Sequence, residues 1–158
     1  MDLSREERAL YNPAFTAVLC TRAVQGYDKE YATPCPLPVA VTAAVMALQP
    51  SIRAALPATT GAGLMGWLDA NEAVRIAMTR NATALATVVR PGLLFALQTR
   101  VLHCTDAGLT LVPRALTKTV NGATPQTIAI QKAAVLLGRW LPSTGSLSTV
   151  LTLLGVKP

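Results

Sequence analysis

The stretch LLFALQTRVLHCTDAGLTLVP, residues 93–113, predicts a helix that leads directly into a β-hairpin. Its apolar first part predicts a helix that ends near Arg100. Two short runs, Val101–Thr105 and Leu109–Val112, then flank Asp106–Gly108, a three-residue loop with glycine at its end. This spacing is typical of a β-hairpin. A helix followed by a strand, a tight turn and a strand is the order in which a winged helix ends.

Before this stretch the sequence predicts a series of helices. Asn12-Pro13 is typical of an N-cap followed by the first helical residue, and Gly26 is interpreted as the stop of that helix. A second helix is predicted from Leu37 to just before Pro50, with one further turn after this proline and a short helix within Thr59–Asp69.

A long helix is predicted from about Glu72 to Val89. Asp69 to Glu72 fits a capping pattern at its start. Arg90-Pro91 is interpreted as a break, with Pro91 as the first residue of the next helix, because proline lacks the amide that an uninterrupted helix needs.

After the hairpin two more helices are predicted. Thr124-Pro125 again looks like an N-cap and first residue, and that helix is expected to reach about Leu141. A last helix is expected over Ser146–Leu154, stopped by Gly155.

The predicted fold is therefore mainly α with one β-hairpin, a helical domain containing a winged-helix-like unit. One domain is expected over residues 1–158. It divides into N-terminal helices at 11–70, the winged-helix-like unit at 71–116 and C-terminal helices at 117–158.

The charge of the chain is unevenly distributed. Of its 158 residues 51% are hydrophobic, and its net charge is +6. Residues 1–72 hold five Lys or Arg and seven Asp or Glu, whereas residues 73–158 hold nine Lys or Arg and one acid, Asp106. This favours a polyanionic partner for the C-terminal half, either nucleic acid or an acidic protein face. A solubilising surface on an apolar chain is the alternative.

The sequence predicts a protein of the cytoplasm with no membrane partner. Its longest uncharged stretch is interrupted by prolines, and the apolar run Leu37–Leu48 is shorter than the roughly 20 residues that cross a bilayer. The N-terminal residues are charged and do not resemble a signal peptide. Cys20, Cys35 and Cys104 are odd in number and unpatterned, which favours reduced thiols.

No pattern in the sequence predicts catalysis, a cofactor or a metal. The GxGxxG match at Gly61–Gly66 follows no predicted strand and has no acid about 20 residues later, so the glycines are interpreted as a turn. His103, the single histidine, and its neighbour Cys104 would point to opposite faces of a strand. Asp69 and Glu72 are better explained by helix capping. We therefore expect a protein that is not an enzyme.

The predicted winged helix is poorly suited to reading DNA bases. Pro91 to Phe95 would face the bases, yet they offer no side-chain donor or acceptor. Contact with DNA phosphates, or with an acidic partner, is still open for eight basic residues: Arg75, Arg80, Arg90, Arg100, Arg114, Lys118, Lys132 and Arg139. Each could equally be a solvated surface residue. Protein docking is predicted at Leu93, Leu94, Leu109 and Trp140.

Short sequence words along the chain carry a family resemblance. In order they are NPAF (12–15), GYDKEY (26–31), CPLP (35–38), ALP (55–57), LLFAL (93–97), LGRWL (137–141) and LLGVKP (153–158). In this order and spacing, from about Tyr11 to Pro158, the sequence resembles the middle component of three-component ABC-ATPase systems. Lamassu-type and Menshen-type complexes of bacterial conflict systems are the relevant relatives.

The resemblance implies a non-catalytic adaptor or regulatory subunit and carries over no catalytic residues. Its implied partners are an SMC/Rad50-like ABC ATPase and an effector, often a nuclease, in an obligate hetero-oligomer that defends against phage or plasmids and that can touch double-stranded DNA non-specifically. A free-standing winged-helix transcription regulator is the alternative function.

Overall fold

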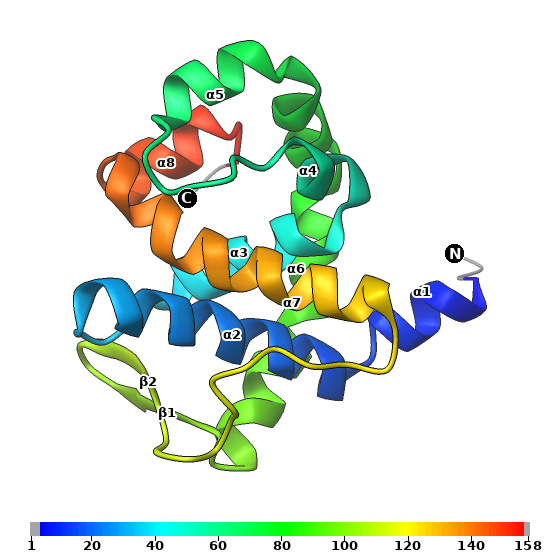
Figure 1. The fold of residues 1–158 in the computed structure, drawn as a ribbon, viewed down its shortest axis with the longest axis vertical. Coiled ribbons are helices and arrows are strands. Elements are labelled where there is room, and N and C mark those ends of the chain that lie inside the picture. Colours follow the sequence, from blue (N-terminus) through cyan, green and yellow to red (C-terminus); the bar gives the residue numbers. More distant parts are fainter. Residues whose placement is uncertain (1–3, 157–158) are drawn as a thin grey trace.

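The fold is mainly helical with one β-hairpin, as the sequence predicts (Figure 1). The structure is a computed structural model and describes residues 4–156. Within this range the elements are α1 (Arg5–Leu10), α2 (Pro13–Tyr31), α3 (Leu37–Leu48), α4 (Pro50–Ala55), α5 (Leu64–Ala70), α6 (Glu72–Gln98), β1 (Leu102–Thr105), β2 (Gly108–Leu111), α7 (Pro125–Trp140), the 3-10 helix η1 (Leu141–Thr144) and α8 (Leu147–Leu153).

Helices α2 and α7 lie side by side across the middle of the molecule, and α6 passes behind them (Figure 1). The long α6 starts at the end that carries α5 and α8, and it leads into the hairpin at the opposite end. The buried apolar side chains of α2, α3, α5, α6, α7, α8 and the hairpin form one core cluster. The loop from β2 to α7 returns along α2, on the hairpin side of the molecule.

Three helix starts are confirmed, and each is stabilised by a side-chain cap. The Asn12 side chain accepts a hydrogen bond from the amide of Phe15 at 2.9 Å. Thr124 and Thr127 form a reciprocal capping box at the start of α7, and Ser146 caps α8 by accepting from the amide of Thr149 at 3.3 Å. These caps satisfy amides that the first turn of a helix leaves unpaired.

The prediction that α2 stops at Gly26 is wrong. The helix continues to Tyr31 and ends at Ala32, whose φ of 51° is left-handed. Gly26 instead lies where α7 crosses α2, and a Cβ at this position would overlap the carbonyl oxygen of Val135. The glycine therefore permits a close approach between two helices, which a single sequence cannot distinguish from a helix stop.

The predicted break at Arg90-Pro91 is also wrong, because Pro91 lies inside the uninterrupted helix α6. The next residue, Gly92, packs against α2 so closely that a Cβ there would overlap the Thr16 hydroxyl. The helix therefore continues through a position where proline donates no backbone hydrogen bond, and it packs tightly on α2 at the next residue. No new helix begins at Pro91, so no helix N-terminus is available there for DNA. The winged-helix-like character of residues 71–116 stays a prediction that rests on the order of helix and hairpin.

The capping role predicted for Asp69 is wrong as well. Asp69 lies within α5, and the N-cap residue of α6 is Asn71, whose side chain makes no capping hydrogen bond. The Asn71 amide group donates instead to the carbonyl oxygen of Trp67 at 2.9 Å. Helices α5 and α6 follow each other so closely that Asn71 serves the end of the first rather than the start of the second.

The hairpin is confirmed, with a two-residue rather than a three-residue loop. Thr105 pairs with Gly108, so only Asp106 and Ala107 form the turn. Two pairs of residues share one face as the spacing predicts, Leu102 with Leu111 and Cys104 with Leu109. The hairpin is attached to the helices through Cys35, whose amide donates to the Leu109 carbonyl at 2.8 Å while the Leu109 amide donates back at 2.7 Å.

Candidate partner-binding surface

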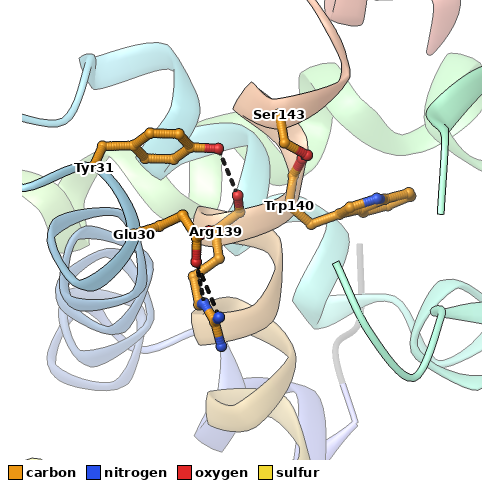
Figure 2. Close-up of polar contacts among 5 residues, drawn as sticks. All are labelled: Glu30, Tyr31, Arg139, Trp140 and Ser143. Atoms are coloured by element: carbon orange, nitrogen blue, oxygen red, sulfur yellow. Dashed lines mark hydrogen bonds and ion pairs between the residues drawn. The ribbon is translucent and has the colours of Figure 1, made fainter. Parts of the chain in front are cut away.

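The crossing of α2 and α7 joins two of the family-like words, GYDKEY and LGRWL. A Cβ at Gly138 of α7 would overlap the carbonyl oxygen of Ala23, just as one at Gly26 would overlap Val135. Each helix thus contributes a glycine that lets the backbone of the other approach. Two side-chain contacts close the end of the crossing, as Figure 2 shows. Arg139 pairs with Glu30 at 2.9 Å, and the Tyr31 hydroxyl donates to the Arg139 carbonyl oxygen at 2.8 Å.

Trp140 connects this crossing to α5. Its side chain points away from the Glu30–Arg139 pair (Figure 2) and is fully buried. The indole N–H donates to the Ala62 carbonyl oxygen at 2.6 Å, and the ring packs edge-to-face on Trp67 with centroids 5.0 Å apart. Within the glycine-rich segment 61–66, residues 61–63 form the turn before α5, residues 64–66 begin the helix, and Ala62 accepts the hydrogen bond from Trp140. The segments GYDKEY, LGRWL and 61–66 therefore have a structural role in the packing of the helices.

Arg22 is a residue that the sequence analysis missed. Its side chain is 1% exposed, although no carboxylate within residues 4–156 pairs with it. The guanidinium donates to the side chain of Gln131 at 3.0 Å and to the carbonyl oxygen of Thr117 at 2.6 Å. Arg22 thereby attaches the loop before α7 to α2 and α7, and burial lowers its pKa. One signal was available, because Arg22 shares a helix face with Leu19, Ala23 and Gly26.

An apolar groove of about 670 Å³ lies on the surface between α3, α6 and α8. We call it the α3–α6–α8 groove. Helix α3 contributes residues at helical spacing, and α6 contributes a row of residues about one turn apart. Its lining residues are Leu37, Pro38, Val41, Thr42, Val45, Met78, Ala82, Ala86, Arg90, Leu93, Leu94, Leu147, Ser148, Leu151 and Val156. Only Thr42, Ser148 and Arg90 carry polar side chains, so water wets this surface poorly.

The four residues predicted for docking lie in different surroundings. Leu109 and Trp140 are fully buried in the core, and Leu93 is 6% exposed. Leu94, at 59% exposed, is the only one of the four that offers most of its side chain to a partner, and it lies at the rim of the α3–α6–α8 groove. Apolar spacing alone did not separate core residues from surface residues, because both kinds of residue are apolar.

The eight basic residues do not gather into one patch. Arg139 is engaged by Glu30, and the Arg75 side chain donates to the carbonyl oxygen of Leu153 at 3.2 Å. The other six are exposed and make no ion pair with a residue in 4–156. They lie on α6 (Arg80, Arg90), beside the hairpin (Arg100, Arg114), on the following loop (Lys118) and on α7 (Lys132).

Arg100 and Arg114 lie together at the open end of the hairpin. The hydrogen bond from the Val112 amide to the Val101 carbonyl oxygen, 3.0 Å long, brings the chain before β1 close to the chain after β2. Both arginines are exposed and both have left-handed backbones, with φ of 59° and 64°. Such conformations are uncommon for residues other than glycine.

The histidine and the three cysteines are divided between the exposed hairpin and the buried core. His103 and Cys104 are exposed on β1, and Cys104 pairs across the hairpin with Leu109. Burial raises the pKa of Cys20 and of Cys35 to about 12, which leaves both thiols protonated at neutral pH. Within residues 4–156 no group of three or more His, Cys, Asp or Glu side chains is arranged to hold a metal ion.

None of the helices within residues 4–156 combines the length and the apolar character needed to cross a bilayer.

Comparison with known proteins identifies the family. The family model of the ABC-three component (ABC-3C) system Middle Component 3 matches residues 1–158. Comparisons with curated proteins and with solved structures gave no match. The match confirms the resemblance carried by the words between Tyr11 and Pro158, and its description implies that the chain works with other components of an ABC system. The chain belongs to the Middle Component 3 family of ABC-three component systems.

Proposed function

We propose that this chain is a non-catalytic adaptor in a bacterial complex that defends against phage or plasmids. In this role it links an SMC/Rad50-like ABC ATPase to an effector subunit, such as a nuclease, and it regulates the effector through that link. The observation that carries the proposal is the family match over the whole chain.

The surface of the chain supports an adaptor role. The α3–α6–α8 groove leaves apolar side chains exposed to water, which a stable partner would cover. Elsewhere in the molecule, the close packing of α2 on α7 at Gly26 and Gly138 gives the chain a closely packed body. An adaptor needs such a rigid body with an uncovered surface, and it needs no assembled catalytic groups.

Co-purification tests the adaptor proposal. The tagged chain is expressed together with the ABC ATPase and the effector encoded beside it, and the complex is analysed by size-exclusion chromatography with mass measurement. We expect all three proteins in one complex. A well-behaved monomer that leaves both neighbours unbound would contradict the proposal.

Contact with DNA phosphates is a second part of the proposed function. The observation that favours it is the exposed pair Arg100 and Arg114 at the open end of the hairpin, without an ion pair in residues 4–156. Phosphate contact needs only accessible positive charge, and it does not depend on base sequence.

Fluorescence anisotropy with duplexes of unrelated sequence tests this part. For the assembled complex we expect affinity that is independent of sequence and falls steeply with salt. The double variant Arg100→Glu/Arg114→Glu is expected to reduce the salt slope by about 2, because each phosphate contact contributes roughly 0.9. An affinity for one sequence about 10³-fold above the rest would favour the alternative, a free-standing transcription regulator.

A further inference from the structure

We propose that the α3–α6–α8 groove binds one amphipathic α-helix of a partner component, and that Arg90 pairs with a carboxylate on this helix. The inference rests on the proposed adaptor function and names the partner chemistry for one surface. It is carried by the form of the groove, its lining and its single charge.

The form of the groove fits a helix. Its lining on α6 extends from Met78 to Leu94, which is about 24 Å at the helical rise. Ala82 and Ala86 provide a low floor on this side, which lets a partner approach closely. The larger side chains Leu37 and Leu94 rise at the rim, 38% and 59% exposed. A low floor between larger side chains accommodates the apolar ridge of a helix at i, i+3, i+4 and i+7.

A strand is a poorer occupant. An extended peptide binds tightly when it adds to a free sheet edge, whose unpaired backbone groups supply the hydrogen bonds. The groove is lined by side chains of α3, α6 and α8 together with Val156 just beyond α8, and none of its lining residues belongs to β1 or β2. The backbone of an extended peptide would therefore lose its hydrogen bonds to water without replacement.

The single charge of the groove indicates which side chain the partner helix carries. Arg90 is its only charged lining residue, is exposed, and makes no ion pair within residues 4–156. A bound apolar surface would remove water from around this guanidinium, and an unpaired buried charge is costly. A carboxylate on the partner helix, near the end that meets Leu94, removes this penalty. Arginine also suits carboxylates because it can bind both oxygens at once.

A second copy of this chain fits the groove less well. Symmetric pairing would bring a groove against the same groove, so that two concave apolar surfaces leave space between them. It would also bring the two Arg90 side chains onto one interface, between chains that each carry a net charge of +6. Like charges across an interface oppose association.

Paired substitutions test the inference. Arg90→Glu and Leu94→Asp change the groove. Lys29→Glu and Ile76→Asp are controls of the same chemical kind, since both positions are exposed and outside the lining. Each variant is co-expressed with the ABC ATPase and the effector, and affinity is measured by titration of the purified chain into the remaining components. Circular dichroism during heating checks that all four variants fold.

We expect the two groove variants to weaken binding by about tenfold or more and the two controls to bind like the wild type. Reversing the facing carboxylate of the partner to lysine is expected to restore binding of Arg90→Glu. If the wild type binds its partners and the groove variants bind equally well, the groove inference is overturned while the adaptor function stands. If the wild type binds neither component, the adaptor function itself fails, and the groove inference fails with it.

Two other results would also overturn the inference. One is a wild-type dimer, seen by sedimentation, that Arg90→Glu dissolves while partner binding is unchanged. The other is binding of the chain to vesicles of phosphatidylglycerol and phosphatidylcholine that Leu94→Asp abolishes, again without an effect on the partner components.

Discussion

Two regions of this protein are built from similar apolar helices, but one is closely packed and the other leaves an open groove. At the crossing of α2 and α7, Gly26 and Gly138 let the two backbones touch, and the contact is closed by the Glu30–Arg139 pair. In the α3–α6–α8 groove the side chains of the three helices leave about 670 Å³ open.

The difference shows that residue size at the contact, more than hydrophobicity, decides whether a helix pair is sealed. A helix pair without side chains between its backbones leaves no space for water or for a partner, because close packing removes it. The groove is equally apolar, but the burial that it offers is left for another chain. We therefore expect substitutions at the crossing to change stability and substitutions in the groove to change binding.

Thiol labelling gives the largest contrast between the two regions. Burial raises the pKa of Cys20 on α2 to about 12, so that only about one molecule in 10⁴ carries the reactive thiolate at pH 8. A thiol introduced at the groove rim by Leu94→Cys is expected to react with Ellman's reagent orders of magnitude faster, as is the exposed native Cys104. Stopped-flow absorbance in a Cys104→Ser background separates the reaction of the new thiol from that of Cys104. Equal rates for Cys20 and the new thiol would show that the core opens readily.

Substitution of the crossing glycines is expected to destabilise the fold strongly. Gly26→Ala or Gly138→Ala would force a Cβ into a backbone carbonyl of the opposite helix, and overpacking of this kind costs about 2–3 kcal/mol. Urea unfolding followed by circular dichroism measures the change.

Gly66→Ala is the matched control for the crossing glycines. Gly66 lies inside α5 with nothing near its missing Cβ, so alanine there is expected to stabilise by up to about 1 kcal/mol. If all three variants gained stability, the crossing would be looser than its geometry indicates.

Arg22 is expected to have the next largest effect. Arg22→Met leaves the Gln131 side-chain oxygen without its donor and removes one of the two side chains that donate to the Thr117 carbonyl oxygen, the other being Gln25, at a cost of about 2 kcal/mol. Hydrogen exchange of residues 117–121 should also accelerate, because the loop loses part of its attachment to α2. Arg80→Met, at an exposed position, should change neither quantity. Unaltered exchange in the Arg22 variant would argue that the loop is held by other contacts.

The Glu30–Arg139 pair is expected to contribute about 0.5 kcal/mol. Its two side chains are about one-third exposed, at 36% and 32%, and solvent weakens such pairs. A double-mutant cycle with Glu30→Gln and Arg139→Gln, measured by urea unfolding at low and high salt, isolates the coupling between the two side chains. A coupling above about 2 kcal/mol would mean that the pair is far better shielded than its exposure suggests.

The smallest effect is expected in the groove. Leu94→Ser removes an apolar side chain that is 59% exposed, so the free energy of unfolding should change by less than about 0.5 kcal/mol. Leu137→Ala, at a fully buried position of α7, should cost about 2–5 kcal/mol. Equal losses in the two variants would mean that Leu94 belongs to the core and that the groove is closed in solution.

Much of the fold could be predicted from local sequence signals. Asn12-Pro13 and Thr124-Pro125 mark helix starts because a polar cap and a proline satisfy the first turn without any distant residue. The hairpin follows from the glycine after Asp106-Ala107 and the short apolar runs on both sides. In the candidate site, Leu93, Leu94 and Arg90 were recognised as surface or docking candidates, and two of these three are exposed.

Local sequence signals were sufficient to predict where several helices start and where the hairpin turns, since those signals act within a few residues. The continuation of α2 through Gly26, the continuation of α6 through Pro91 and the burial of Arg22 depend on tertiary contacts. Each of these outcomes depends on a second helix or a loop that is distant in the sequence. A glycine can end a helix or admit a neighbouring backbone, and an apolar residue can fill a core or line a groove. The helix or loop that packs against the residue determines which of these occurs.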